Sequence, residues 1–440
     1  MELLNSLRGI SQRAVIFLLV GLALRGALIV AHQRPPISDE RDYHQLAVSL
    51  STTGTYGVNG TPTAYRPFAY PAFIGFVYIL AGEYPLVVKI LQAIADLLIA
   101  LLLFLLLKEA PEASRIAALA LWCFFLPAAL YTNFLLTETV FTFVLVVFCF
   151  VLVRSKLEKP SIALMLGVVL GLLVLMKPGM LLLVVLLPIV LYFGWIPLKR
   201  YKFIVVGTLL VLTPWLIRNY YVLGKPTIAT NGGINLLIGN NPNSTGAYAM
   251  SYPEDVLQGA ANEIDADETA YRYALNYILD NPARFILNGF KKIAHLFSSE
   301  SGLLVWSFHD QPEDFSERFA AKYASVPFLY TILVNATYVF VLLVGILGLF
   351  TAQKNLLWWF VIVLVACWLA THFVFFGGSR YHFPLMPFFA LYAGTVIPHF
   401  LYAIRRLTTM QKAAYGTITL GLLTVWIAEV ATIANALSPS

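Results

Sequence analysis

Long apolar runs separated by short polar segments fill most of the 440-residue chain. The runs are continuous rather than alternating in polarity, and many approach the roughly 20 residues that a helix needs to cross the hydrocarbon core of a bilayer. Continuous runs indicate spanning helices, because the strands of a membrane barrel alternate apolar and polar residues. The pattern predicts an all-α polytopic membrane protein with about eleven transmembrane helices. The expected spans are residues 14–31, 86–107, 116–131, 133–153, 161–176, 179–196, 203–217, 327–350, 356–376, 383–402 and 413–435.

Two regions interrupt this pattern and divide the chain into three parts. Residues 1–218 form an N-terminal transmembrane module with a long first outer loop at 32–81, whose apolar tail at 67–81 is too short to span and predicts an interfacial helix. Residues 219–326 are mostly polar and predict a small extracytoplasmic domain, α-helical or mixed. The remaining residues, 327–440, return to spanning helices.

Composition agrees with a membrane protein and excludes several other classes. Hydrophobic residues make up 59% of the chain and charged residues only 12%, about half the share in soluble domains. This excludes a cytosolic enzyme, a disordered protein and a secreted disulfide scaffold. The net charge of +6 is scattered along the chain, so no nucleic-acid-binding stripe is expected. The three cysteines all fall within predicted spans, and the seven histidines form no metal-ligand set.

Basic residues in alternate loops orient the protein. Placing the basic N-terminal end in the cytoplasm puts a series of Lys- and Arg-containing short loops on that side, as the positive-inside rule requires. These residues are Lys108, Arg115, Arg154, Lys156, Lys159, Lys199, Arg200, Lys202, Lys354, Arg405, Arg406 and Lys412. The loop at 32–81 and the region at 219–326 then lie outside.

Four cations break this charge rule because they fall at the outer ends of predicted helices: Arg66, Lys177, Arg218 and Arg380. Proline follows or precedes three of them closely, which fixes where each helix starts or stops. Together they predict a binding site for an anion at headgroup level, where a low dielectric strengthens the attraction. The alternative for each single cation is snorkelling to lipid phosphate.

Lys89 lies seven residues before Asp96 on one face of the second span, and it is expected to reach the same outer site. Asp96 lies about 10 Å deeper and is expected to pair with Arg25 or another buried cation.

Acidic residues on the outer side are equally selective. Asp39 and Glu40 lie in the first outer loop, and Glu138 falls at the outer start of the fourth span. An acid within an apolar run is costly, so it indicates a functional role. For Asp39 the alternative is a helix cap, since Asp is a favoured cap residue.

These groups fit one chemistry, the transfer of a sugar that is linked through phosphate to a membrane-dissolved isoprenoid. The leaving phosphate needs positive charge rather than a general acid, whereas the attacking hydroxyl needs a general base. Asp39 is the candidate base, Glu138 would position hydroxyl groups, and the four cations would hold the phosphate without a metal. A single in-line displacement would invert the anomeric configuration.

Five motifs, in this order, resemble those of the integral-membrane glycosyltransferases of the glycosyltransferase-C superfamily, in particular the branch containing protein O-mannosyltransferases and aminoarabinose transferase. The motifs are Asp39-Glu40-x-x-Tyr43-x-x-x-Ala47, Arg66-Pro67-x-x-Tyr70-Pro71, Leu135-Leu-Thr-Glu138, Pro214-Trp-x-x-Arg218-Asn219 and Arg380-Tyr381-x-x-Pro384.

The resemblance implies a polyprenyl-phosphate sugar donor and an acceptor hydroxyl on a lipid, glycan or protein. It also implies a protein of the bacterial inner membrane whose active site faces the extracytoplasmic side. It implies catalytic roles for Asp39 and Glu138, with Glu40 beside them, and a phosphate contact at Arg66. We expect the remaining site residues to be Lys89 and Tyr381 at the donor and Tyr43, Tyr65, Tyr70, Asn231 and Asn240 at the sugar or acceptor. The last two lie in Gly- and Asn-rich runs at 230–235 and 239–246, for which a series of Asx turns is the alternative to substrate contact.

Three other functions compete with this prediction. An O-antigen ligase or polymerase would place its key Arg and His in a large late outer loop. A metal-dependent enzyme would hold a divalent cation with Asp39, Glu40 and Glu138, although no cofactor is expected to be required. A transporter or flippase for lipid-linked sugars would show inverted repeats and broken midplane helices, and the sequence shows no clear repeat.

Overall fold

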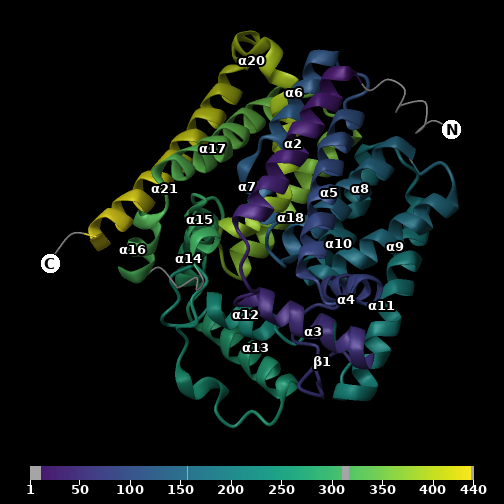
Figure 1. Cartoon of the computed structure of the whole chain (residues 1–440), viewed down its shortest axis with the longest axis vertical. Helices are drawn as coiled ribbons and strands as arrows, with labels where there is room; N and C mark the ends of the chain where they lie inside the picture. Colours follow the sequence, from purple (N-terminus) through teal and green to yellow (C-terminus); the bar gives the residue numbers. More distant parts are fainter. Residues whose placement is uncertain (1–10, 156, 310–316, 438–440) are drawn as a thin grey trace.

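The computed structural model describes residues 11–155, 157–309 and 317–437. Within these ranges the chain is almost entirely helical (Figure 1), and the only sheet is a two-stranded hairpin of β1 (Gly57–Val58) and β2 (Thr61–Pro62). This confirms the all-α prediction.

Eight helical stretches of the described chain are long and apolar enough to cross a membrane. They are α2 (Gln12–Ala31), α5 (Pro85–Leu106), α8 (Thr137–Ser155), η2 and α11 (Leu198–Leu223), α17 (Phe328–Thr351), α18 (Leu356–Val374), the stretch from η4 (Ser379–Leu385) through α19 (Met386–Val396) and η5 (Ile397–His399) to α20 (Phe400–Arg406), and α21 (Thr409–Leu437).

The difference from eleven expected spans arises at three places. α9 (Pro160–Met176) and α10 (Leu181–Phe193, after η1, Pro178–Met180) are apolar but shorter. The expected span at 116–131 is divided into α6 (Glu112–Cys123) and α7 (Leu126–Tyr131). Pro127 lies in the first turn of the second piece, where proline is favoured, whereas it would disrupt the interior of one continuous helix.

Small residues let the spans pack closely. A Cβ atom on Gly167 of α9 would lie 2.1 Å from the backbone oxygen of Ile204 on α11, so only glycine fits this crossing. Nearer the N-terminus, Arg25 of α2 and Asp96 of α5 form the expected ion pair with no exposed surface, and the Trp122 indole N–H also donates to Asp96. The bundle core therefore contains a fully satisfied charge pair.

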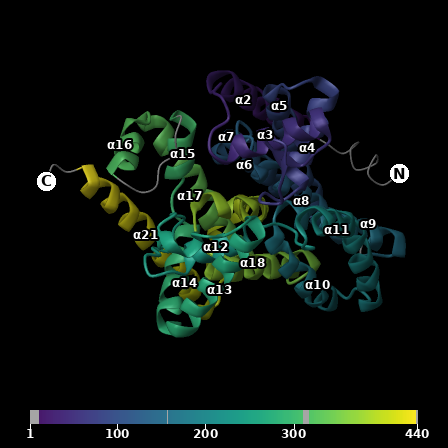
Figure 2. The same cartoon turned by 90° about the horizontal axis from the view of Figure 1, so that it is seen from below.

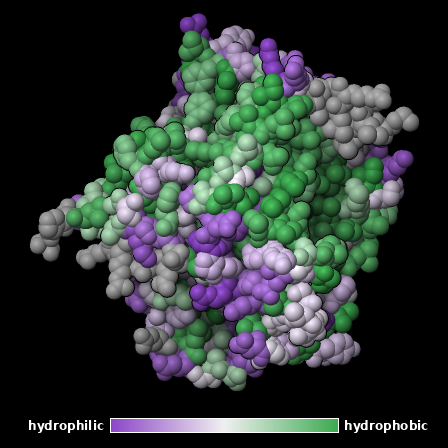
Figure 3. All heavy atoms as spheres, in the orientation of Figure 1, coloured by the Kyte–Doolittle hydropathy of each residue, from purple (hydrophilic) through white to green (hydrophobic). Residues whose placement is uncertain are grey.

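The two ends of the bundle differ in charge. One end holds the loops α5–α6, α8–α9, α10–α11, α17–α18 and α20–α21, and the predicted cytoplasmic Lys and Arg residues lie in these loops or in the helix ends beside them. Lys156, of the same predicted set, lies outside the described residues. We call the opposite end, at the bottom of Figure 1, the site end. Apolar side chains cover the bundle, and polar side chains gather at the site end over α12 and α13 (Figure 3).

Two groups of short helices lie at the site end. Residues 32–81, the predicted first outer loop, contain α3 (Asp39–Thr53) and α4 (Ala69–Ala81), which pack on each other, so the expected apolar helix near 67–81 is present. Residues 219–326 form α12 (Gly232–Gly239), η3 (Glu254–Leu257), α13 (Glu263–Asp280), α14 (Pro282–Leu296), α15 (Ser301–Phe308) and α16 (Glu317–Ser325).

These helices are only partly a separate unit. A small core of their own joins Leu236 and Leu237 of α12 to Ala270 and Ala274 of α13. In contrast, α14 packs against the span α18, and the view from the site end shows α12, α13 and α14 beside that span (Figure 2). This region therefore covers part of α18 at the site end and can position residues there.

Candidate functional site

The site begins at the first residue of α3. Ser38, which precedes the helix, has a φ of 48°, a conformation that costs an L-residue about 1–3 kcal/mol. Its side chain makes no capping hydrogen bond, and Asp39 lies within the first turn rather than at the cap position. The alternative of Asp39 as a helix cap is therefore wrong, and its carboxylate is available for other partners.

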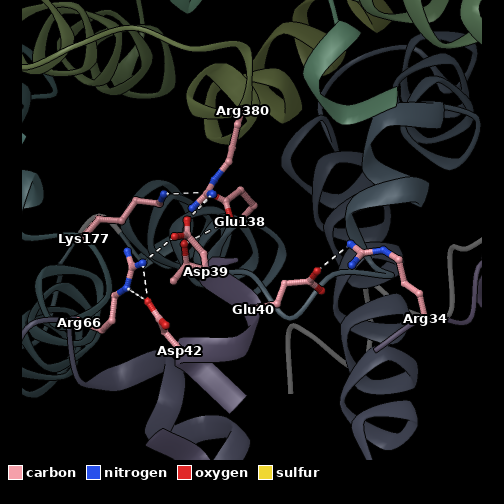
Figure 4. A network of polar contacts seen from close by, with 9 residues as sticks. Arg34, Asp39, Glu40, Asp42, Arg66, Glu138, Lys177 and Arg380 are labelled. Atoms are coloured by element: carbon pink, nitrogen blue, oxygen red, sulfur yellow. Dashed lines mark hydrogen bonds and ion pairs between the residues drawn. The ribbon is translucent and has the colours of Figure 1, made fainter. Parts of the chain in front are cut away.

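Two arginines bind the Asp39 carboxylate, one to each oxygen. Arg66 Nη2 lies 2.6 Å from Oδ1, and Arg380 Nη1 lies 2.6 Å from Oδ2. Arg66 also donates to Asp42 Oδ2 from Nε at 3.0 Å and from Nη2 at 2.7 Å. The first loop and the turn after α18 thus meet at one carboxylate (Figure 4).

Arg380 continues the network to a second acid. Its Nε donates to Glu138 Oε1 at 2.9 Å, and Lys177 Nζ donates to the same oxygen at 3.2 Å. The ion pairs therefore run from Asp42 through Arg66, Asp39 and Arg380 to Glu138 and Lys177, with alternating charge. Three carboxylates face three cations, which leaves the network neutral.

The charge state of Asp39 follows from this network. Burial alone would raise the pKa of its carboxyl, but Arg380 and Arg66 more than offset that effect and lower the pKa to about 2. Asp39 is therefore ionised at neutral pH.

A cavity of about 840 Å³ opens beside the network and is lined by Asp39, Arg66, Lys177 and Arg380. Aromatic rings border it: the Arg66 guanidinium lies over the rings of Tyr43 and Tyr65, and that of Arg380 lies over Trp306 and Tyr381. Rings next to cations are suited to flat or apolar parts of a ligand, whereas the cations are suited to an anion. The volume matches that of a small-molecule site.

Close backbone packing fixes the turn that holds Arg380. A Cβ atom on Gly377 would lie 1.8 Å from the Lys292 backbone oxygen, and the Gly377 N–H donates to Gly246 O at 2.9 Å. The Trp368 indole N–H donates to Tyr381 O at 2.6 Å. Arg380 is therefore held from both sides.

A buried pair adds a further anchor to this turn. His382 Nε2 lies 3.0 Å from Glu300 Oε1, and its Nδ1 lies 2.8 Å from Leu296 O. Both side chains have no exposed surface. The pair therefore ties η4 to α14 and α15.

Lys177 and Glu138 are positioned by helix ends. α9 ends at Met176 and Lys177 is extended, because the following Pro178 disfavours helical geometry at the residue before it. Glu138 lies in the first turn of α8, where the helix dipole favours a negative charge. Its side chain is fully buried and does not line the cavity, so Glu138 contacts Arg380 and Lys177 rather than a ligand.

Glu40 does not lie at the cavity. Successive helical residues point about 100° apart, so Glu40 faces the bundle while Asp39 faces the cavity. Glu40 Oε2 accepts from Arg34 at 2.6 Å, and its Oε1 accepts from the Leu135 N–H at 2.9 Å. A direct catalytic contact for Glu40 is therefore wrong; it joins α3 to the segment before α8.

Two of the expected donor cations also lie elsewhere. α11 continues past the predicted end at 217, so Arg218 is an internal helical residue that donates to the backbone oxygens of Thr63 and Tyr56. It holds the first-loop hairpin and does not line the cavity. Lys89 is buried near Glu40 and Arg34, also outside the cavity lining.

Of the residues expected to contact the sugar or the acceptor, some line the cavity and others do not. Tyr43, Tyr65 and Asn231 line the cavity. Tyr70 is fully buried and donates to Gln92 Oε1 at 2.8 Å, whereas Asn240 accepts from Lys292 Nζ at 2.8 Å and donates to backbone oxygens. These last two therefore hold helices together.

Sequence reasoning missed three residues that belong to the site or its support. Asp42 shares Arg66 with Asp39, and its spacing of three residues on one helix face was the available signal. Trp306 lines the cavity, and its buried indole nitrogen has no hydrogen-bond partner among the residues that the structure describes. Lys292 lies behind Gly377 with no exposed surface. Neither of the last two had a sequence signal.

No group of three or more His, Cys, Asp or Glu residues is arranged to hold a metal ion in the part of the chain that the structure describes. Both oxygens of Asp39 and one oxygen of Glu138 contact cationic side chains instead.

No protein-family model matches the chain, and no curated protein sequence matches it. Solved structures do share features of the fold. The apo oligosaccharyltransferase of Archaeoglobus fulgidus is 12% identical with a TM-score of 0.47, and the match covers 97% of this chain but 56% of that one. This chain thus spans little more than half the length of the archaeal enzyme.

A second archaeal structure, the oligosaccharyltransferase AglB in complex with an inhibitory peptide and a dolichol-phosphate, gives 13% identity and a TM-score of 0.45, with the same coverage. ArnT from Cupriavidus metallidurans bound to undecaprenyl phosphate is 13% identical with a TM-score of 0.41, covering 87% of this chain and 77% of that one. The matched proteins are membrane glycosyltransferases of the superfamily that the sequence motifs resemble. At these values the similarity concerns the fold alone, so the residues of this chain must carry a functional assignment.

Proposed function

We propose that the protein is an inverting glycosyltransferase that moves a sugar from a polyprenyl-phosphate donor to an acceptor hydroxyl. The observation that carries the proposal is the contact of one cavity-facing carboxylate, Asp39, with two guanidinium groups, Arg66 and Arg380. In this proposal Asp39 is the base and the two arginines bind the phosphate, so the base and the phosphate-binding pair are hydrogen-bonded to each other.

The cations supply what the leaving group needs. Arg66, Arg380 and Lys177 line the same cavity and present forked and point donors, which match the oxygens of a phosphate. Positive charge that is fixed before the reaction stabilises the phosphate as it leaves and requires no general acid. We propose no metal cofactor, because the three cationic side chains already supply the positive charge that a metal ion would provide to the leaving phosphate.

The reaction proceeds by a single displacement. The acceptor oxygen attacks the anomeric carbon while the bond from that carbon to the phosphate oxygen breaks, and its electron pair leaves with the polyprenyl phosphate. The hydroxyl proton passes to Asp39, and the configuration at the anomeric carbon inverts.

Donor binding would also prepare the base. With both arginines bound, Asp39 has a pKa of about 2 and is a poor proton acceptor. A donor phosphate competes for Arg66 and Arg380, so it weakens their contacts to Asp39, raises the pKa of the carboxyl and frees its lone pairs. Glu138 keeps Arg380 and Lys177 in place during this exchange.

Charge asymmetry supports a site on the extracytoplasmic side. The predicted cytoplasmic Lys and Arg residues lie in the loops and helix ends at the opposite end of the bundle, whereas the site end presents the cavity. We therefore propose a multi-pass protein of a bacterial inner membrane. The donor carries a hexose or pentose, and the acceptor hydroxyl belongs to a lipid, a glycan or a protein.

The test is turnover of a polyprenyl-phosphate sugar by the purified full chain in nanodiscs. Asp39→Asn should lower kcat by about 10²- to 10⁴-fold, the usual contribution of a general base. Binding of polyprenyl phosphate should be retained, because the arginines remain. Asp255→Asn, which changes an exposed acid in η3, is the matched control. Near-normal turnover by Asp39→Asn would exclude Asp39 as the base, and inhibition of the wild type by a chelator would favour the metal-dependent alternative.

A further inference from the structure

The segment that leads to Arg66 has no regular structure of its own. Residues 63–66 follow β2 and precede α4, and they belong to neither a helix nor a strand. Such a segment keeps one conformation only if other parts of the chain bind its backbone groups. Arg218 already binds the Thr63 carbonyl oxygen at 2.9 Å, and further contacts come from still later in the chain.

Residues 219–326 bind both backbone groups of Ala64, two residues before Arg66. The Ala64 N–H donates to Glu263 Oε1 at 2.8 Å, and its carbonyl oxygen accepts from the Thr230 N–H at 3.0 Å. Ala64 has no exposed surface, so these groups depend on protein partners. Thr230 lies just before α12 and Glu263 begins α13, and the two helices share the small core described above. One packed unit, which lies beside the β1–β2 hairpin (Figure 1), therefore holds Ala64 from two sides.

The second carboxylate oxygen of Glu263 extends this contact toward Arg66. Glu263 Oε2 accepts from the Thr63 hydroxyl, and the Thr63 hydroxyl oxygen accepts from the Tyr65 N–H at 2.9 Å. A hydroxyl that donates to a carboxylate is fixed in orientation, so Glu263 also fixes the acceptor for the residue directly before Arg66. One carboxylate thereby orders three successive residues, Thr63, Ala64 and Tyr65.

A helix-capping role does not explain Glu263. Asn262 caps α13, because its side-chain oxygen accepts from the Ile264 and Asp265 N–H groups, both at 3.0 Å. Within the described residues, both hydrogen bonds of the Glu263 carboxylate go to the first loop, 199 and 200 positions earlier in the chain. The carboxylate therefore serves the first loop rather than its own helix.

Arg66 depends on this support when a ligand enters the cavity. Its guanidinium is held by Asp39 and Asp42, but under the proposed function a donor phosphate competes with Asp39 for it. The backbone contacts are then what keeps the side chain within reach of the phosphate. They include the Tyr56 hydroxyl, which donates to Arg66 O at 2.7 Å, and the bonds to residues 63–65. A residue that is already in position loses less freedom when the ligand binds.

We propose that Glu263 is a positioning residue for Arg66, through which the unit of α12 and α13 controls phosphate binding in the cavity. Glu263 does not line the cavity, so it acts through the first loop rather than on the ligand. The inference rests on the proposed function, because it takes Arg66 as a ligand of the donor phosphate. It gives residues 219–326 a part in donor binding.

A double-mutant cycle on polyprenyl phosphate binding tests the proposal. The lipid is titrated into the purified full chain in nanodiscs, for the wild type, Glu263→Ala, Arg66→Gln and the double variant. Glu263→Ala should weaken binding about 3- to 10-fold, within the range of coupling between residues of one hydrogen-bond network. In the Arg66→Gln background the same change should have no further effect, because the first loop then no longer positions a guanidinium group.

Substitutions at Thr63 test the contact from the other side. Thr63→Val removes the hydroxyl with little change of shape and should weaken binding, whereas Thr63→Ser keeps the hydroxyl and should retain the wild-type affinity. Glu268→Ala is the matched control, because Glu268 is an exposed acid of the same helix whose pair with Lys225 is also exposed, and it should change nothing. If Glu263→Ala does not fold, the two Thr63 variants decide.

The outcomes separate this inference from the proposed function. A wild type that does not bind polyprenyl phosphate overturns the proposed function and this inference with it. Binding that is weakened in Arg66→Gln but unchanged in Glu263→Ala and Thr63→Val overturns the positioning role alone. An equal loss from Glu263→Ala in the wild-type and Arg66→Gln backgrounds also overturns that role, because the effect would then bypass Arg66.

Discussion

Arg380 Nη1 lies 2.6 Å from Asp39 Oδ2, although 341 residues separate them in the chain. The same guanidinium donates to Glu138, so one side chain after α18 joins the acid of the first loop to the acid at the start of α8. The site therefore depends on three distant segments, and changes in each should give different results.

Arg66→Gln should weaken binding of polyprenyl phosphate by about 10- to 100-fold, the usual effect of losing hydrogen bonds between charged groups. The reason is that Arg66 lines the cavity and is one of two guanidinium groups at Asp39. Binding can be measured by titrating the lipid into protein in nanodiscs. Arg66→Lys keeps the charge but loses the paired N–H donors of the guanidinium group, so an intermediate affinity is expected. Unchanged affinity in Arg66→Gln would show that Arg66 does not bind the phosphate.

Glu138→Gln should change binding and turnover in opposite directions. Three carboxylates balance three cations in the network, so neutralising Glu138 leaves an excess positive charge and should tighten polyprenyl phosphate binding. Arg380 and Lys177 lose their shared partner, so kcat should fall. Glu138→Asp should restore part of kcat, because a carboxylate is kept. Weaker lipid binding with unchanged kcat would contradict a positioning role.

Asp96→Asn should lower the free energy of unfolding by about 3–5 kcal/mol, because Arg25 would be left buried without its counter-charge. Reversible unfolding in mixed micelles measures this change. The double variant Arg25→Met with Asp96→Leu should recover most of the loss, since apolar residues can replace a buried ion pair. A single variant as stable as the wild type would mean that water or another group compensates Arg25.

Stability should rise with pH on account of Lys292. Burial lowers the pKa of its ammonium group from 10.5 to about 7. Between these values the unfolded chain binds a proton that the folded chain does not, so the free energy of unfolding increases as pH rises from about 7 towards 10. Melting temperatures compared at about pH 7 and pH 9 measure the effect. Lys292→Met should remove this increase and the exposed neighbour Lys291→Met should not; an identical pH dependence in all three proteins would refute the assignment.

The sequence was sufficient to predict most of the spans and several residues that meet at the cavity. Hydrophobic run length located the helices, and charges at predicted outer ends singled out Asp39, Arg66, Lys177 and Arg380, which the structure brings together. A charge at a helix end in a membrane has few places to lie, so linear position is informative there.

Residues inside regular helices could not be assigned in this way. Asp39 and Glu40 are adjacent and chemically alike, but the helix points them to opposite surroundings, and only the start of α3 decides which one faces the cavity. Pro214 predicts that the span stops near Arg218, whereas α11 continues past that proline to Leu223. Packing on neighbouring helices outweighed the local signal at both places.

The position of Arg380 also has a consequence for biogenesis. The ribosome delivers Asp39 and Arg66 to the membrane early, but the guanidinium that completes the pair arrives only after α18 has been made. During most of translation the first loop therefore contains Asp39 and Arg66 but lacks the contact with Arg380. Nascent chains stalled before that point should integrate into the bilayer and yet be unable to hold the ligand.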